Sequence, residues 1–317
     1  MSIYNFIQTK QINSKLFLEY LAMANKTNQF TNGGYAVRQL EQRARTMLQI
    51  TDNKAVIATN SGTSALHAII LTLNKHLGKL RLATQSFNFP SAIQGPAKDS
   101  KILDFDDSLD IDLSNIDDID VLIPTNCFGH LQNIDKIQNK GKIVIYDNAA
   151  SPYSFWRGYN SCNYGVASFI SLHHTKPLGF GEGGLVIIDS YYEQTVRAII
   201  AFDKQANGSF TRLGNNYKMS ELAAAGILQW WDQFDINKLK DMYFTRYITL
   251  KESLLNQVNF FKHSAAANEI FFPNCLPVLY TDKNIESKNA MKYYKPLDNS
   301  KIANDVYNKI SCLPLAD

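Results

Sequence analysis

The residues with the clearest potential for chemistry are a lysine and the glycines that follow it. Lys176 follows a short apolar segment, residues 167–170, and precedes a glycine-rich turn that leads into a second apolar segment, residues 185–189. A lysine held in a close-packed corner between two strands can be desolvated, which favours its neutral, nucleophilic amine. Such an amine can form a Schiff base with an aldehyde cofactor, whereas a single lysine in a loop is more often simply solvated. The other segments of the chain decide between these two interpretations.

A second candidate site is the sequence Ser61-Gly-Thr-Ser64, which follows the apolar segment 55–58 and opens a helical pattern over residues 63–73. Backbone N–H groups at a helix N-terminus, with the helix dipole behind them, can bind a phosphate. Gly62 would let the backbone approach that phosphate closely, and Thr63 would add a hydroxyl. The same pattern also serves as an ordinary helix cap with no ligand. It therefore indicates a phosphate site only together with the other motifs.

Two further residues could contact a planar, positively charged ring. Asp147 ends the apolar segment 143–146, at the end of a strand where open α/β sheets bind their ligands. Its carboxylate could keep a pyridine nitrogen protonated, and a helix-capping aspartate is the alternative. Phe89 lies in a loop after the segment 82–84, and its face could stack on a cofactor ring. Core packing is the commoner role of a single phenylalanine.

One glycine pattern is misleading. Residues 179–184 read Gly-Phe-Gly-Glu-Gly-Gly and so have the spacing of a dinucleotide-binding fingerprint. That fingerprint requires a helix after the glycines, whereas here the strand pattern 185–189 follows them. We therefore predict no dinucleotide site at this turn. The adjacent His173 and His174 diverge and belong to no zinc-ligand spacing, so no metal is expected.

Composition excludes several classes of protein. The chain has 317 residues, of which 45% are hydrophobic and 19% charged, as in a globular protein with one large and one smaller domain. A net charge of +3 is too small to indicate nucleic acid or an anionic membrane as a partner. No apolar run reaches the length of a membrane span, and no signal-sequence pattern opens the chain. Four scattered cysteines predict reduced thiols in a cytoplasmic protein.

The order of the elements predicts an α/β fold with a mainly parallel sheet, because helical and strand patterns alternate. Helical patterns cover residues 37–48, 63–73, 219–231 (continuing after a break near residue 235 to about 255) and 299–310. Strand patterns cover residues 55–58, 102–105, 121–123, 143–146, 167–170 and 185–189. The helical stretch that begins at residue 219 indicates the passage to a smaller domain. We therefore expect a large domain over residues 1–230 and a small C-terminal domain over residues 231–317.

Taken in order, these motifs resemble the nucleotide-sugar aminotransferases of the DegT/DnrJ/StrS group, which use pyridoxal phosphate on the fold-type-I scaffold. The resemblance runs from about Gln29 to Asp317. It is carried by five segments, residues 61–66, 85–89, 146–149, 171–184 and 214–221. It implies a fold-type-I α/β fold, in which the large domain has a mainly parallel seven-stranded sheet flanked by helices and the small C-terminal domain is also α/β.

The resemblance implies a role for each residue that matches a motif. Lys176 would carry the Schiff base with pyridoxal 5'-phosphate and, once released, would move protons between substrate and cofactor. Asp147 would pair with the ring nitrogen, and Phe89 would stack on the ring. Ring binding and catalysis would thus depend on these three side chains.

The same resemblance implies how the phosphate and the substrate are bound. The phosphate would be held by Gly62, Thr63 and Ser171, and Asn216 of a second subunit would reach the same phosphate. The active site would then be shared between the two subunits of a homodimer. Arg212 and Lys218 are candidates for substrate contacts, with plain surface residues as the alternative. Lys218 replaces the usual arginine of the motif, and Ala150 replaces a usual Gln or His near the ring hydroxyl.

The implied activity is transfer of an amino group from glutamate to a nucleotide-linked keto-sugar, with pyridoxamine phosphate as the intermediate form of the cofactor. Within the family we favour a dTDP-linked 4-keto-6-deoxyhexose, whose amino sugar would enter polysaccharide or O-antigen biosynthesis. Two alternatives stay open. Related sugar dehydratases carry a histidine in place of the lysine, and Lys176 argues against that chemistry. A catalytically idle regulatory or scaffold relative is disfavoured by the intact lysine, aspartate and phosphate-loop residues, although Ala150 keeps it open.

Overall fold

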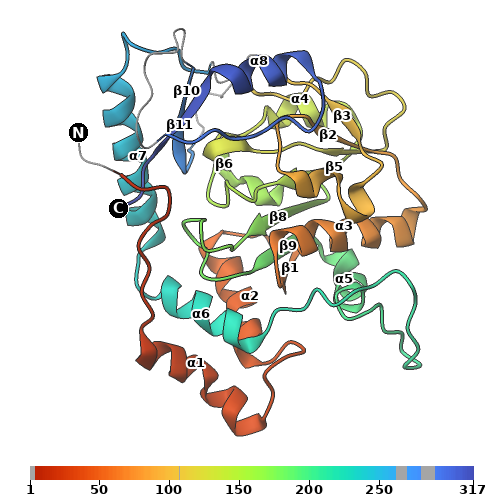
Figure 1. Ribbon diagram of the computed structural model, residues 1–317. Coiled ribbons are helices and arrows are strands. Elements are labelled where there is room, and N and C mark those ends of the chain that lie inside the picture. Colours follow the sequence, from red (N-terminus) through yellow and green to blue (C-terminus); the bar gives the residue numbers. More distant parts are fainter. Residues whose placement is uncertain (1–3, 107, 262–269, 280–289) are drawn as a thin grey trace. The chain divides into compact units, whose positions relative to one another are not determined.

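Helices and strands alternate along the chain in the computed structural model, which describes all residues except 1–3, 107, 262–269 and 280–289 (Figure 1). The chain forms two compact units. The first comprises Thr9–Leu80 and Cys162–Ile236 and is called the lysine unit here, because it contains Lys176. The second comprises Met1–Gln8, Arg81–Ser161 and Asn237–Asp317 and is called the aspartate unit, because it contains Asp147.

Three buried strands form the centre of the lysine unit. They are β1 (Lys54–Thr59), β8 (Ala167–Ser171) and β9 (Gly184–Asp189), in the order β1-β9-β8. The central strand β9 runs antiparallel to both of its neighbours, and its first residue, Gly184, lies opposite both Thr59 and Ser171. The carboxyl ends of β1 and β8 therefore lie on either side of the start of β9.

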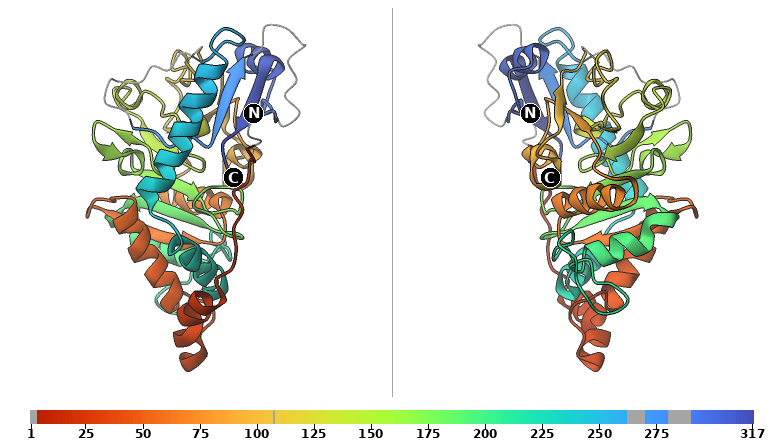
Figure 2. Two further views of the ribbon diagram at one scale, coloured as in Figure 1. Left: turned by 90° about the vertical axis from the view of Figure 1, so that its left-hand side faces the viewer. Right: turned by 90° about the vertical axis from the view of Figure 1, so that its right-hand side faces the viewer.

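The helices of the lysine unit bury the faces that their sequence spacing predicts. They are α1 (Ser14–Thr27), α2 (Tyr35–Met47), α3 (Gly62–Leu77), α5 (Glu193–Ile199) and α6 (Glu221–Trp231), with the short turns η4 (Ser161–Asn163) and η5 (Ser190–Tyr192). Helix α3 packs on β8 and β9. Its residues Leu66, Ile69 and Leu73 are buried at the spacing of one helix face. Helix α6 packs against α1 and α2 (Figures 1 and 2).

Four parallel strands form the centre of the aspartate unit. They are β2 (Leu82–Gln85), β3 (Lys101–Leu103), β4 (Val121–Ile123) and β5 (Ile143–Asp147), in the order β5-β4-β2-β3. The other elements are η1 (Pro90–Ile93), η2 (Gly95–Ala97), η3 (Cys127–Gly129), α4 (Ile134–Gln138), β6 (Phe155–Trp156), β7 (Tyr159–Asn160), α7 (Ile236–Ser253), β10 (Cys275–Leu279), α8 (Lys301–Lys309) and β11 (Ile310–Pro314). Because parallel strands end at the same edge, the residues that follow β2, β4 and β5 are brought close together.

An aromatic cluster fixes the loop that follows β2. The Phe87 ring is fully buried and lies 5.3 Å from the Phe105 ring and 6.2 Å from the Phe128 ring, measured between centroids. Tyr294 closes the cluster and is stacked on Phe128 at 5.6 Å. This packing anchors the loop that carries Phe89, two residues further along the chain.

The predicted fold class, a fold-type-I α/β fold, is confirmed. The central strands described above number seven, three in the lysine unit and four in the aspartate unit, as expected. Strand β9 runs antiparallel to its neighbours, so the strands are mainly rather than wholly parallel. The strand predicted over residues 121–123 is β4, and the helix predicted over residues 63–73 extends further, to Leu77. Strand β3 ends at Leu103, two residues before the predicted end, and Phe105 forms only an isolated bridge with Ile111. The domain boundary at residue 230 stays a prediction.

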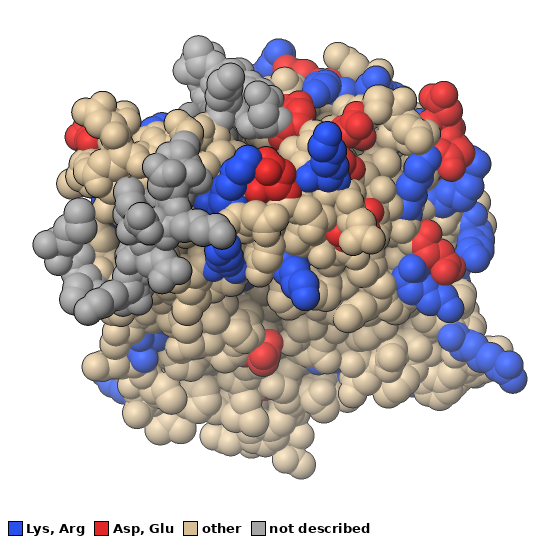
Figure 3. All heavy atoms as spheres, turned by 45° about the horizontal axis from the view of Figure 1, so that its top comes forward, with Lys and Arg blue, Asp and Glu red and all other residues tan. Residues whose placement is uncertain are grey.

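On the face drawn in Figure 3, basic and acidic side chains are interspersed. Within the part of the chain that the structure describes, no helix is both long enough and apolar enough to span a bilayer. Among the same residues, no group of three or more His, Cys, Asp or Glu side chains is arranged to hold a metal ion. All four cysteines are buried.

Candidate active site

The register of the lysine unit brings two of the predicted motifs together. The turn after β1 and the loop after β8 both begin beside Gly184. A Cβ atom placed on Gly184 would lie 2.3 Å from the carbonyl oxygen of Ser61, and one placed on Gly62 would lie 3.1 Å from the Cβ atom of Ser171. Gly62 and Ser171, both predicted phosphate ligands, are thus in close contact, and position 184 accommodates no side chain.

We expect Gly184→Ala to lower the free energy of unfolding by about 1–3 kcal/mol, because the added methyl group would collide with backbone rather than with a flexible side chain. Thermal and urea unfolding of the purified variant measure this loss. The matched control is Gly181→Asn in the same loop. Gly181 has a φ of 67° and no atom within 4 Å of an added Cβ, and asparagine tolerates such a φ. Equal stability of Gly184→Ala and the wild type would contradict the close packing described above.

The turn that opens helix α3 has the donors that a phosphate needs. Ser61 caps the helix, since its Oγ accepts a hydrogen bond of 3.1 Å from the N–H of Ser64. The next two N–H groups, those of Gly62 and Thr63, have no acceptor among the described residues. Free N–H groups at the start of a 16-residue helix can bind an anion, and the role of these two groups as phosphate ligands stays a prediction.

The segment that contains Asn216 lies beside the same turn. The side chain of Asn60 donates a hydrogen bond of 3.1 Å to the carbonyl oxygen of Asn216, and the Asn60 N–H donates to the carbonyl oxygen of Tyr217 at 2.8 Å. Lys218 Nζ donates to Asn216 Oδ1 at 2.8 Å. The structure therefore places exposed Asn216 next to the turn that opens helix α3 of its own chain. Its contact with a second subunit stays a prediction.

Lys176 lies half-buried in the loop that connects β8 and β9. Its N–H donates to the carbonyl oxygen of His173 at 2.8 Å, and its own carbonyl oxygen accepts from the N–H of Gly179 at 2.9 Å. A Cβ atom on Gly179 would lie 2.0 Å from the carbonyl oxygen of His173. The absence of side chains at Gly179 and Gly184 thus permits the loop to pack closely against neighbouring backbone. The strand predicted after the glycines is β9.

In the aspartate unit, a chain of hydrogen bonds connects Asp147 with Phe89. Asp147 is 5% exposed, and its Oδ1 accepts from the N–H of Ala149 at 2.9 Å while its Oδ2 accepts from Thr125 Oγ1 at 3.2 Å. Thr125 Oγ1 in turn accepts from Asn88 Nδ2 at 2.7 Å, and Asn88 Oδ1 accepts from the N–H of Phe89 at 2.7 Å. The Phe89 side chain is 59% exposed, so its ring is available for stacking.

Thr125 and Asn88 were not predicted from the sequence. Each follows a strand of the parallel set, β4 for Thr125 and β2 for Asn88, as Asp147 ends β5. Their positions in the sequence could have identified them, because polar residues that follow neighbouring parallel strands meet at the same edge of the sheet. Because the Thr125 hydroxyl accepts from Asn88, its single proton is directed to the carboxylate of Asp147.

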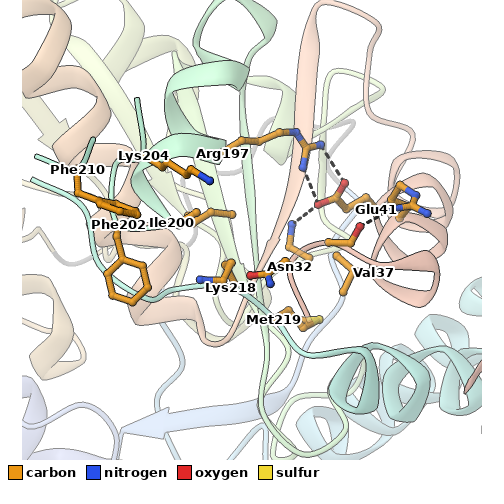
Figure 4. Close-up of a pocket in the computed structure, with 14 residues that line it drawn as sticks. Asn32, Val37, Glu41, Arg197, Ile200, Phe202, Lys204, Phe210, Lys218 and Met219 are labelled. Atoms are coloured by element: carbon orange, nitrogen blue, oxygen red, sulfur yellow. Dashed lines mark hydrogen bonds and ion pairs between the residues drawn. The ribbon is translucent and has the colours of Figure 1, made fainter. Parts of the chain in front are cut away.

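A cavity of about 780 Å³ in the lysine unit is lined by one of the candidate substrate residues, Lys218 (Figure 4). Within it Arg197 Nη2 lies 3.0 Å from Glu41 Oε2, so these two charges neutralise each other. Lys218 Nζ lies 4.8 Å from the centroid of the Phe202 ring, and burial lowers the pKa of its ammonium group. The other candidate, Arg212, is exposed and has no hydrogen bond or ion pair with the described residues.

Comparison with known proteins decides the family. The sequence profile of the DegT/DnrJ/EryC1/StrS aminotransferase family matches residues 11–315, nearly the whole chain. The chain belongs to this family. This aminotransferase is 23% identical to dTDP-4-amino-4,6-dideoxy-D-glucose transaminase from Shigella dysenteriae, in an alignment that covers 94% of this chain and 90% of the relative.

Solved structures show the same fold. A putative PLP-dependent aminotransferase from Bacillus cereus superposes with a TM-score of 0.82 at 22% identity, over 100% of this chain and 96% of the other. Helicobacter pylori PseC, an aminotransferase involved in the biosynthesis of pseudoaminic acid, gives a TM-score of 0.81 at 16% identity, over 99% and 94% of the two chains. The predicted family and the predicted class of enzyme, an aminotransferase, are confirmed. The roles of the individual site residues stay predictions.

Proposed function

We propose that this protein is a pyridoxal 5'-phosphate-dependent aminotransferase that moves an amino group from glutamate to a nucleotide-linked keto-sugar and so makes an amino sugar. The proposed acceptor is a dTDP-linked 4-keto-6-deoxyhexose. One observation carries the proposal: in a member of an aminotransferase family, Gly184 pairs with both Thr59 and Ser171. The loop of Lys176 therefore begins beside the turn that would bind the phosphate. The Shigella relative, a dTDP-amino-sugar transaminase, supports the choice of nucleotide and ring position.

The residues of the lysine unit fit the phosphate end of the cofactor. The N–H groups of Gly62 and Thr63 and the hydroxyl of Ser171 would bind the phosphate, and the missing side chain at Gly62 lets this turn pack closely against Ser171. When bound through a Schiff base, pyridoxal phosphate supplies an electron sink for the reacting carbon. Lys176 would form that covalent bond and, once released, would hold and move the proton at the substrate carbon.

The residues of the aspartate unit fit the ring of the cofactor. The Asp147 carboxylate would accept a hydrogen bond from the protonated ring nitrogen, and the exposed face of Phe89 would stack on the ring. The hydrogen bonds of Thr125 and Asn88 would fix the position of Asp147 relative to Phe89. Lys218 and Arg212 would bind the negatively charged groups of the substrate.

We also propose that the enzyme is a cytoplasmic homodimer in which Asn216 reaches the phosphate bound by the partner. The Asn216 side chain is exposed, as a contact with a second subunit requires. Neither nucleic acid nor a membrane is a proposed partner. The product would serve the biosynthesis of a polysaccharide such as an O antigen.

The function is tested by the colour of the purified protein and by a panel of sugars. With pyridoxal phosphate the protein is expected to be yellow, and glutamate is expected to bleach it as the cofactor takes up the amino group. One nucleotide keto-sugar of the panel should restore the colour, and the ring position of the new amine identifies the acceptor. A bound cofactor that does not respond to glutamate would contradict an aminotransferase and would favour a dehydratase or a scaffold protein.

A further inference from the structure

Carbonyl oxygens of the Lys176 loop converge on a second lysine, Lys10, which no sequence motif singles out. Lys10 Nζ donates hydrogen bonds of 2.7 Å to the carbonyl oxygens of His174 and of Lys176 itself. A third hydrogen bond goes to the carbonyl oxygen of Gly179. An ammonium group has three N–H donors and no acceptor, so these contacts use its full hydrogen-bonding capacity.

Two tryptophans at the end of α6 complete the same set of contacts. Trp230 Nε1 donates to the carbonyl oxygen of Pro177 at 3.0 Å, and Trp231 Nε1 donates to that of Leu178 at 2.7 Å. Lys10 Nζ also lies 5.5 Å from the centroid of the Trp230 ring, within reach of a cation–π interaction. Side chains of the lysine unit therefore hold the carbonyl groups of residues 174 and 176–179.

The contacts of Lys10 are needed because this loop lies outside the strand ladder. Lys10 supplies the donor for the carbonyl oxygens of His174 and Gly179, and a second donor for that of Lys176, which also accepts from the N–H of Gly179. A carbonyl group shielded from water that loses its donor is destabilising. Burial lowers the pKa of Lys10 to about 7. The three carbonyl acceptors raise the pKa of Lys10, because they favour the ammonium form, and only that form has three N–H donors.

We propose that Lys10 is a positioning residue for Lys176. By fixing the carbonyl groups on both sides of Lys176 and at Lys176 itself, it gives the main chain one conformation and so presents the Lys176 amine in one direction. The proposal rests on the proposed role of Lys176 as the residue that bonds the cofactor. Lys10 acts through the backbone of the loop and needs no contact with cofactor or substrate.

The test compares three variants of the full chain with the wild type. Lys10→Met keeps an unbranched apolar stem and removes all three donors, whereas Lys10→Arg keeps a positive charge with several donors. Lys15→Met, on the exposed surface of α1, is the matched control, because Lys15 has no hydrogen bond or ion pair with the described residues. If Lys10→Met fails to fold, Lys10→Gln replaces it in the test. Glutamine keeps one donor group, so this variant loses only part of the hydrogen bonds to the loop.

The first measurement is amide hydrogen exchange of the cofactor-free protein, followed by mass spectrometry. In Lys10→Met we expect peptides that cover residues 172–183 to exchange about tenfold faster or more, because the loop loses three anchors. Peptides from α3 should exchange as in the wild type. Lys10→Arg should recover part of the protection, and Lys15→Met should leave it unchanged.

The second measurement separates positioning from stability in the cofactor-loaded enzyme. We expect kcat of Lys10→Met to fall by about 10–100-fold, the loss typical of a reactive group misplaced by about 1 Å, while KM for glutamate changes little. Loop exchange equal to that of the wild type would overturn the proposal. So would faster exchange throughout the lysine unit with an unchanged kcat, because that result describes a lysine with a purely structural role. If wild-type protein failed to respond to glutamate, the proposed function would fail, but the exchange experiment would still test the anchoring.

Discussion

Lys176→Ala is expected to reduce transamination by a factor of about a thousand or more, because the variant loses both the nucleophile that bonds the cofactor and the carrier of the proton. The fold should survive this change. The hydrogen bonds that Lys176 makes to His173 and Gly179 come from its main chain, and its side chain is only half-buried. A stability change within about 1 kcal/mol is therefore expected. Single-turnover rates with glutamate and thermal unfolding measure the two quantities.

Lys176→Arg sharpens this test. Arginine keeps the positive charge and much of the length of lysine, but its guanidinium group stays protonated and cannot act as a neutral amine. We expect it to be as inactive as Lys176→Ala, whereas a role in simple charge balance would leave it active. Thr175→Ala, at the exposed neighbouring position, should keep nearly full activity. An active Lys176→Arg enzyme would contradict the assigned role.

Asp147→Asn is expected to produce the second largest loss, a decrease of about 100-fold in both half-reactions together with weaker binding of pyridoxal phosphate. Its physical cause is the lost negative charge opposite the ring nitrogen, since a charge-assisted hydrogen bond is about twice as strong as a neutral one. Stopped-flow kinetics with glutamate, and then with the keto-sugar, measure the two rates. Titration of the absorbance with the cofactor measures the affinity.

Two further variants identify the origin of that loss. Asp147→Ala should also lower the stability. The buried Thr125 hydroxyl loses its acceptor at a cost of about 1–3 kcal/mol, and the part-buried Ala149 N–H loses its acceptor as well. Thr125→Val interrupts the hydrogen-bonded chain between Asp147 and Phe89 but keeps the carboxylate, so its effect should be smaller than that of Asp147→Asn. Wild-type rates in Asp147→Asn would mean that another group pairs with the ring nitrogen.

The sequence predicted the local elements well, because their signals are local. The cap Ser61 and the apolar spacing of Leu66, Ile69 and Leu73 lie within one short segment, and helix α3 begins where that segment indicates. The strand after the glycines was predicted for the same reason. It is β9, so the literal dinucleotide spacing of residues 179–184 leads into a strand.

The contacts between distant segments could not be predicted from the sequence. An alternation of apolar residues says which face of a strand is buried but not which strand lies beside it, so the double pairing of Gly184 was not visible. Thr125 and Asn88 are single polar residues without a motif. Lys10 lies in a polar stretch near the start of the chain, and only the folded structure shows that it contacts the loop of Lys176.

The central claim, that Lys176 bonds the cofactor, has one direct measurement. The protein is loaded with pyridoxal phosphate, reduced with borohydride so that a Schiff base becomes a permanent bond, digested and analysed by mass spectrometry. We predict a single labelled peptide with the pyridoxyl group on Lys176, and no such label in Lys176→Ala. Cofactor that binds without labelling this peptide, or a label on a different lysine, would contradict the claim.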